Sequence, residues 1–287
     1  MIEAATHDFH VPASSMPRRR QLTEPRLIRW TLIGLSLGFL TLFLAVPLAA
    51  VFVEALANGF GRYFSAIVEP EALAALRLTL LTAAIAVPAN LVFGLCAGWA
   101  IAKFDFRGRS LLTTLVDLPF AVSPVIAGLV FVLLTGRQGF FGPWLAAHDL
   151  QIIYAVPGIV LASVFVSFPF VAREVIPIME ASGRHEEEAA RVLGASGWQT
   201  FLRVTLPNIK WGVVYGVILC SARVLGEFGA VSVVSGRIRG LTNTLPLHVE
   251  VLYNEYQFQA SFAVASVLTG LALVTLVIKT VAERRLE

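Results

Sequence analysis

Residues 182–210, SGRHEEEAARVLGASGWQTFLRVTLPNIK, form the longest polar interval between the apolar blocks of this 287-residue chain. Their pattern predicts two short helices joined by a tight turn. The first helix covers residues 184–193 and carries three glutamates in its first turns, where carboxylates suit the positive end of the helix dipole. Gly194 follows directly, at the position where many helices end in a left-handed residue that glycine adopts at low cost.

The second helix opens at Ser196, and Gln199 stands three residues later, which is the spacing of a capping box. Apolar side chains then recur at i, i+3, i+4 and i+7, so this helix should present one apolar face. That face would consist of Trp198, Phe201, Leu202 and Thr205. We expect Pro207 to end the helix, because proline lacks the backbone donor that a helix interior needs.

A helix-turn-helix unit can bind DNA, but this one is a poor candidate. Its first helix is acidic, whereas nucleic acid attracts basic surfaces, and both flanks are hydrophobic blocks of membrane length. No nucleic-acid partner is therefore expected. Amphipathicity alone leaves open a solvated connecting loop without a specific role. The spacing of individual residues decides between a connector and a functional loop.

The spacing of an EAA triplet, a glycine and a terminal hydrophobic-x-Leu-Pro sequence resembles the EAA loop of ABC importer permeases. The triplet is residues 188–190, the glycine is Gly194, and the terminal sequence is VTLP at 204–207, with valine where isoleucine is commoner. In that family the loop is the coupling helix that docks into a groove on the ATP-hydrolysing subunit. The resemblance implies an ATPase-coupling role for Glu187, Glu188, Ala189, Ala190, Gly194, Leu206 and Pro207.

The composition of the chain is that of a membrane protein. Hydrophobic residues make up 57% of it and charged residues only 14%, against about 25% charged residues in soluble domains. Six apolar blocks are long enough to cross a bilayer as helices, and open strands could not satisfy their backbone in lipid. The expected fold is an all-α integral membrane protein with six transmembrane helices. The blocks lie at residues 30–53, 73–102, 111–134, 152–171, 211–234 and 262–281.

The distribution of basic residues predicts the orientation of the chain. With the amino terminus inside, sixteen lysines and arginines fall in inner segments and five in outer ones, which satisfies the positive-inside rule. Both termini and the polar loop are then cytoplasmic. The predicted organisation is a cytoplasmic tail at 1–28, a first transmembrane helix at 29–55 and a permease core at 72–282 that contains the coupling loop at 182–210.

Two of the spans narrow the resemblance. The third contains DLPFAVSPVIAGL at 117–129, and the fifth contains ARVLGEFGAVSVVSG at 222–236. With GASGW at 194–198, they look like the W-type permease of sulfate/thiosulfate ABC importers; molybdate permeases share much of the fifth-span pattern, so the oxyanion stays open. The resemblance implies the type I importer permease fold in a bacterial inner membrane. It also implies a homologous T-type permease partner, two ATP-binding subunits and a periplasmic sulfate/thiosulfate-binding protein.

Motifs for catalysis and cofactors are missing from the sequence. Without a GxxxxGK[ST] loop the chain cannot hold ATP by that mechanism, so ATP and Mg²⁺ are expected on the partner ATPase. The five histidines are not spaced as metal-ligand pairs and are interpreted as surface residues, and Cys96 and Cys220 as small buried hydrophobes. We expect no catalytic residue, cofactor or metal site, and no enzyme activity in this chain by itself.

Two charges within the fifth span, Arg223 and Glu227, stand four residues apart and can neutralise each other on one helix face. In one reading their sole role is to neutralise each other. In the other, their helix face lines the route of the anion, and Gly226 and Gly229 allow a tight helix contact beside it. A rival class, an ion-coupled secondary transporter, would use Asp117 and Glu227 as ion sites. It leaves the EAA spacing as coincidence, and the chain shows no internal repeat.

Prolines in the third span predict a bend that lines the pathway, because a kinked helix frees carbonyls that need a partner or a wet cavity. Pro119 and Pro124 mark this bend, and Ser123 lies between them; simple packing is the alternative role. The candidate pathway or gate residues are thus Pro119, Ser123, Pro124, Arg223 and Glu227.

Overall fold

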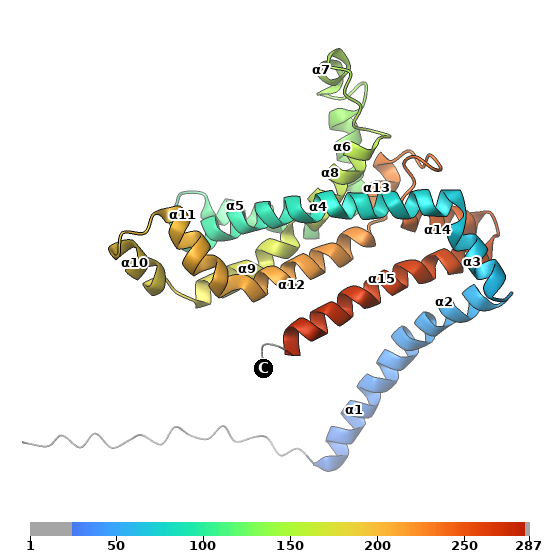
Figure 1. The fold of residues 1–287 in the computed structure, drawn as a ribbon, viewed down its shortest axis with the longest axis horizontal. Helices are drawn as coiled ribbons and strands as arrows, with labels where there is room; N and C mark the ends of the chain where they lie inside the picture. Colours follow the sequence, from blue (N-terminus) through green and yellow to red (C-terminus); the bar gives the residue numbers. More distant parts are fainter. Residues whose placement is uncertain (1–24, 285–287) are drawn as a thin grey trace, which may run out of the picture. The chain divides into compact units, whose positions relative to one another are not determined.

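The computed structural model describes residues 25–284, and every regular element among them is helical (Figure 1). Most of the predicted tail at 1–28 lies outside the described residues, and its last three positions belong to the first helix. Contacts divide the chain into two units, up to Ala49 and from Ala50 onward. The first unit contains α1 (Arg26–Leu40), the π-helix η1 (Thr41–Ala45) and the beginning of α2 (Val46–Leu56), and no side chain of α1 is buried within the chain.

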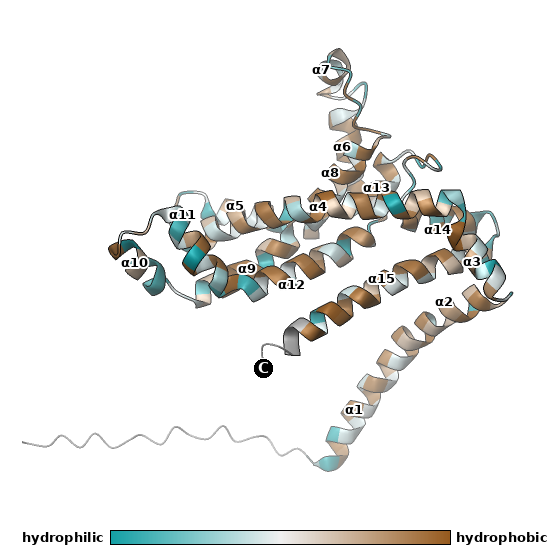
Figure 2. Cartoon of the chain, viewed as in Figure 1, coloured by the Kyte–Doolittle hydropathy of each residue, from teal (hydrophilic) through white to brown (hydrophobic). Residues whose placement is uncertain are grey.

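Five of the described helical stretches are long and apolar enough to cross a membrane, and the bent pair α5–α6 makes a sixth. This confirms the prediction of an all-helical membrane protein. Hydrophobic residues dominate α2 and α15, whereas hydrophilic residues gather around α10 (His185–Val192) and α11 (Gly197–Thr200) (Figure 2). The other helices of the second unit include α3 (Phe60–Val68), α4 (Pro70–Lys103), α7 (Gly142–Ala147), α8 (Val156–Ser167), α9 (Pro169–Ala181), α14 (Leu245–Asn254) and α15 (Phe258–Arg284).

The third span is broken, as its prolines predict. Helices α5 (Arg109–Ala121) and α6 (Pro124–Thr135) are bent by 108° relative to each other. A residue that precedes proline is driven out of the helical region, so Ser123 is extended and Pro124 opens the new helix. Pro119 lies inside α5 and is buried, so the corner belongs to Pro124.

The prediction that Pro207 ends the second loop helix is wrong. Helix α11 continues through the π-helix η2 (Phe201–Thr205) into α12 (Leu206–Leu225), a stretch of 29 residues. At the end of η2 the N–H of Leu206 bonds to the carbonyl of Phe201, five residues back. A wide turn of this kind accommodates the proline ring and its missing donor without ending the helix.

The fifth span ends earlier than its apolar block. Helix α12 stops at Leu225, and the short helix α13 (Gly229–Val234) begins after a break of three residues. The block predicted at 211–234 is therefore two helices rather than one. Hydropathy does not reveal the break, because the residues on both sides of it are apolar.

Glycines bring the two broken spans into direct contact. A Cβ atom on Gly128 of α6 would lie 2.8 Å from the carbonyl oxygen of Ala230 in α13. A Cβ atom on Gly229 would lie 2.9 Å from Cβ of Pro124, at the corner of the third span. Small residues at such positions let helix backbones approach closely. The break in one span therefore lies against the break in the other.

Helix α9 packs between α4 and α12 in the same way. A Cβ atom on Gly94 of α4 would lie 2.7 Å from Cβ of Val171, and one on Gly216 of α12 would lie 2.9 Å from Cα of the same valine. Val171, Val175 and Met179 of α9 are completely buried. This apolar core holds α12 in place along its length.

The contact between the two broken spans can be tested with Gly128→Ala. The added methyl group meets a backbone carbonyl that cannot move alone, so we expect a loss of roughly 1–3 kcal/mol of stability. Gly270→Ala in α15 is the matched control, because no atom lies within 4 Å of the new Cβ and alanine favours a helix interior. Thermal unfolding in detergent measures both variants. An unchanged melting temperature for Gly128→Ala would contradict the contact.

Candidate functional site

The loop between α9 and α12 has the local geometry that the sequence predicts. Gly194 adopts φ +87°, and no atom lies within 4 Å of a Cβ built on it, so the backbone conformation alone selects glycine. The Ser196 hydroxyl accepts a hydrogen bond from the N–H of Gln199, and the Gln199 side chain accepts one from the N–H of Ser196. The predicted left-handed cap and capping box are both confirmed.

Glu187 points inward and attaches the loop to the end of α4. Its carboxylate lies 3.2 Å from Nζ of Lys103 and accepts a 2.6 Å hydrogen bond from the Thr205 hydroxyl. The side chains of Lys103 and Glu187 are only 6% and 15% exposed, so water screens this ion pair weakly. Lys103 also donates a hydrogen bond to the carbonyl of Gly183, where the loop begins. Lys103 therefore holds the first arm of the loop, and Glu187 links that arm to Thr205 in the second.

Exposed charges surround this buried ion pair. Asp105 lies 3.5 Å from Arg109 and 3.4 Å from Arg184, and Arg109 lies 2.9 Å from Glu180. Exposed pairs of this kind contribute about 0–1 kcal/mol each, so the attachment depends mainly on Lys103. Lys103 was not among the functional residues predicted from sequence, because its only local signal is a lysine at the end of an apolar block.

The far side of the loop exposes large apolar side chains. Val192 and Leu193 are 87% and 88% exposed, at the end of α10, and Trp198 is 65% exposed in α11. Glu188 is exposed as well, unlike its neighbour Glu187. Apolar side chains gathered on a polar loop are typical of a contact site for another protein. We call Val192, Leu193 and Trp198 the loop tip.

Arg223 and Glu227 form the predicted ion pair, with 2.5 Å between Nη1 and Oε2. They do not share one helix, however, because α12 ends at Leu225 and Glu227 lies in the break before α13. The other carboxylate oxygen of Glu227 accepts a 2.9 Å hydrogen bond from the N–H of Ala230. Glu227 is 2% exposed and Arg223 29% exposed, so the carboxylate is fixed inside while the guanidinium reaches the surface.

Of the remaining pathway candidates, Ser123 and Pro124 lie at the corner of the third span and Pro119 does not. Pro124 touches the position of Gly229, two residues after Glu227, so the corner and the charged break are neighbours. Ser123 is exposed beside Pro124, whereas Pro119 lies a turn away within α5. Of the two glycines expected to allow a tight contact, only Gly229 does so; the nearest atom to a Cβ on Gly226 is the Ala222 carbonyl oxygen, 3.6 Å away.

Several assignments made from sequence are corrected by the structure. Trp198 and Leu202 are exposed, so only Phe201 and Thr205 of the predicted apolar face point inward. Cys96 is exposed, although Cys220 is buried as predicted. His248 is 1% exposed rather than a surface residue, and its burial lowers the pKa of the imidazole. Within residues 25–284 no group of histidine, cysteine or acidic side chains is arranged to hold a metal ion.

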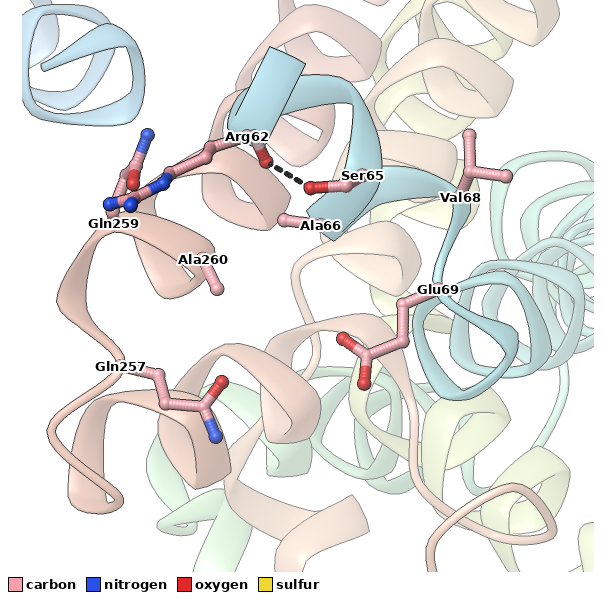
Figure 3. A pocket seen from close by; sticks show the side chains of 8 residues that line it. All are labelled: Arg62, Ser65, Ala66, Val68, Glu69, Gln257, Gln259 and Ala260. Carbon is pink, nitrogen blue, oxygen red and sulfur yellow. Dashed lines mark hydrogen bonds between the residues drawn. The ribbon is translucent and has the colours of Figure 1, made fainter. Parts of the chain in front are cut away.

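A cavity of about 520 Å³ lies apart from these residues, between α3 and the beginning of α15 (Figure 3). Its polar lining includes Arg62, Glu69, Gln257 and Gln259, and the Ser65 hydroxyl donates to the carbonyl of Arg62. It is wide open, and none of the residues singled out from the sequence lines it. The predicted functional residues therefore lie in two other places, the loop and the paired breaks.

Comparison with known proteins places this geometry in a family. The profile described as "Binding-protein-dependent transport system inner membrane component" matches residues 90–287. The chain is 53% identical over 258 residues to "Sulfate transport system permease protein CysW" of Synechocystis sp., covering 90% of this chain and 94% of that protein. It is 41% identical over 244 residues to "Sulfate transport system permease protein CysT" of Escherichia coli K12, covering 85% and 88% of the two chains.

A solved structure shares the fold. A chain of a bacterial alginate ABC transporter, crystallised in complex with an alginate pentasaccharide-bound periplasmic protein, superposes with a TM-score of 0.75. The match covers 91% of this chain and 95% of that chain, at 18% sequence identity. The predicted importer permease fold is thereby confirmed.

The attachment of the loop can be tested with Glu187→Ala. Removing one partner of a buried ion pair leaves Lys103 uncompensated, at a cost of roughly 3 kcal/mol. We expect faster hydrogen exchange of amides in residues 185–205, with the rest of the chain protected as before. Glu188→Ala is the matched control, because that side chain is exposed. Equal exchange in the two variants would mean that the Lys103 contact does not order the loop.

Proposed function

The chain belongs to the family of binding-protein-dependent transport system inner membrane components, and we propose that it is the permease subunit through which an ABC importer moves sulfate. The observation that carries the proposal is the similarity to a sulfate permease along 90% of the chain, with the coupling-loop geometry intact. The chain is a multi-pass inner membrane component, and ATP hydrolysis belongs to a separate subunit.

The transported anion is the finer part of the proposal. The similarity to a sulfate transport permease supports sulfate, and thiosulfate has the same charge and a similar tetrahedral shape. Molybdate permeases share much of the fifth-span pattern, so molybdate is the competing oxyanion. A dianion needs an attractive group that holds it weakly enough for release. Arg223, half-buried beside the break and already balanced by Glu227, has these properties.

The proposed assembly contains four kinds of chain. A homologous T-type permease would be the second membrane subunit, in line with the similarity to CysT. Two ATP-binding subunits would lie on the cytoplasmic side, and a periplasmic sulfate-binding protein on the other side. The excess of basic residues in the inner segments supports both termini in the cytoplasm. We propose residues 29–55 as the first span and 72–282 as the permease core; of the tail expected at 1–28, positions 26–28 belong to helix α1.

Coupling to the ATPase is proposed to run through the loop at 182–210. The loop tip would insert into a groove of the ATPase, which removes three exposed apolar side chains from water. Gly194 sets the angle between α10 and α11, and the Lys103–Glu187 ion pair fixes α10 to the end of α4. Leu206 and Pro207 lie where the loop passes into α12, so movement of the loop reaches the fifth span directly. Glu188, Ala189 and Ala190 complete the expected contact surface.

Reconstitution tests the function as a whole. The chain, its T-type partner and the ATPase are placed in vesicles with the binding protein and radioactive sulfate. We expect uptake that requires ATP, persists with an uncoupler and stops with vanadate, and that excess sulfate or thiosulfate suppresses more strongly than molybdate. Uptake that an uncoupler abolishes would contradict the importer mechanism, and stronger competition by molybdate would reassign the substrate.

A loop-tip variant is the control for coupling in this assay. Leu193→Asp alters an exposed side chain, so the protein should insert normally but lose both ATPase association and uptake. Leu150→Asp changes an exposed leucine outside the loop and should leave ATPase association intact.

The role of Arg223 and Glu227 is tested by Arg223→Gln, Glu227→Gln and the double variant. Each single variant leaves one charge unpaired, at a cost of about 2.5–3.5 kcal/mol at mid-membrane, so we expect lower levels of inserted protein. In the double variant the level should recover while sulfate uptake stays lost. Neutralising Asp117 and Arg173 together is the matched control, because that pair is exposed. Recovery of uptake in the double variant would make the Arg223–Glu227 pair purely structural.

A further inference from the structure

A small cavity lies behind Glu227, and Arg223 is not among its lining residues. Its volume is about 10 Å³. Helices α4 and α8, the break after α12 and the residue before α14 enclose it. Four hydroxyl groups and one carboxylate line it, from Thr79, Thr82, Ser163, Thr244 and Glu227.

Three of these hydroxyls have no hydrogen-bond partner among residues 25–284. They belong to Thr82, Ser163 and Thr244, which are 3%, 1% and 4% exposed. Thr79 is different, because its hydroxyl donates to the Ala75 carbonyl and accepts from the N–H of Leu245. An unsatisfied buried polar group costs about 1–3 kcal/mol, and three around one cavity indicate a ligand that pairs with them.

The size, charge and chemistry of the cavity select its ligand. A volume of about 10 Å³ is close to the minimum for one water molecule, and a water needs two to four polar partners. A tetrahedral oxyanion is far larger. A metal cation would need negative charge, but Arg223 at 2.5 Å already balances the Glu227 carboxylate. We propose that this cavity is a hydration site, where one buried water molecule bridges Thr82, Ser163 and Thr244 behind Glu227.

The hydration site has a consequence for the ion pair that rests on the proposed function. One oxygen of Glu227 is held by the N–H of Ala230, and the other depends on Arg223. When the guanidinium turns towards a passing dianion, the carboxylate loses its counter-ion. The water and the neighbouring hydroxyls can then donate hydrogen bonds to the carboxylate, so Glu227 keeps polar partners until Arg223 returns.

Radiolytic hydroxyl labelling of the intact chain in lipid nanodiscs detects the water directly. Val231 lines the cavity and is 1% exposed, whereas Val171 is 0% exposed and lies in the apolar core. Radicals form from water, so we expect Val231 to be labelled at least several-fold more than Val171. Equal labelling of the two valines would overturn the hydration site.

Two variants show whether the hydroxyls hold the water. Thr82→Val keeps the side-chain shape but removes the hydroxyl, and Ser163→Ala does the same should the first variant fail to insert. Each should reduce labelling of Val231 to the level of Val171. Thr113→Val is the control, because that hydroxyl only donates to the Arg109 carbonyl of its own helix. Labelling of Val231 that persists in both cavity variants would overturn the assignment.

Comparing labelling with sulfate uptake separates the hydration site from the proposed function. Labelling does not require transport, so the hydration site can be present even where reconstituted uptake fails. Loss of labelling with sulfate uptake unchanged would overturn the role of the water in supporting Glu227, and would leave the importer assignment intact. A melting temperature that rises on addition of sodium chloride but not of choline chloride would replace the water with a cation.

Discussion

The arrangement of this chain depends on one constraint, that backbone polar groups within a bilayer must be satisfied inside the protein. Two of its spans are interrupted, after Ala121 and after Leu225, and each interruption frees carbonyls and amides. The structure places the second helix of one broken span against the second helix of the other, with Gly128 and Gly229 removing the side chains that would separate them. This contact covers only part of the non-helical backbone, because Ser123 and Gly226 in the two breaks are exposed.

Buried charged side chains must likewise find their partners inside the protein. Within the described residues, the fully buried carboxylate of Glu227 belongs to the break, where a free amide and an arginine both reach it. The buried Lys103–Glu187 ion pair likewise lies where α4 ends and the loop begins. Both ion pairs occupy the ends of helices, at places where unpaired amide or carbonyl groups are available as additional partners. The two candidate sites are therefore products of helix termination.

Local signals in the sequence were sufficient for local structure. The capping box, the left-handed Gly194 and the corner at Pro124 each depend on a few neighbouring residues, and all are present in the structure. Pro207 shows the limit of such signals, because its effect depends on a wide turn that no short motif specified.

Contacts between distant segments could not be derived from sequence. Lys103 at the end of α4 pairs with Glu187 in α10, 84 residues later, and the cavity behind Glu227 gathers four hydroxyls from three segments of the chain. Periodicity gives the face of a helix but not the partner that will cover it.

The continuous helix from Gly197 to Leu225 has a mechanical consequence. At 1.5 Å per residue its 29 residues form a rod of about 40 Å, with the capping box at one end and the charged break at the other. A tilt of roughly 5° about the π-helix would displace the far end of the 20-residue helix α12, about 30 Å away, by about 2.6 Å. The π-helix near the loop end is the expected pivot, since its wider turn bends more readily than the α-helix that follows. The protein thus contains a lever whose short arm is the loop and whose long arm ends at Arg223.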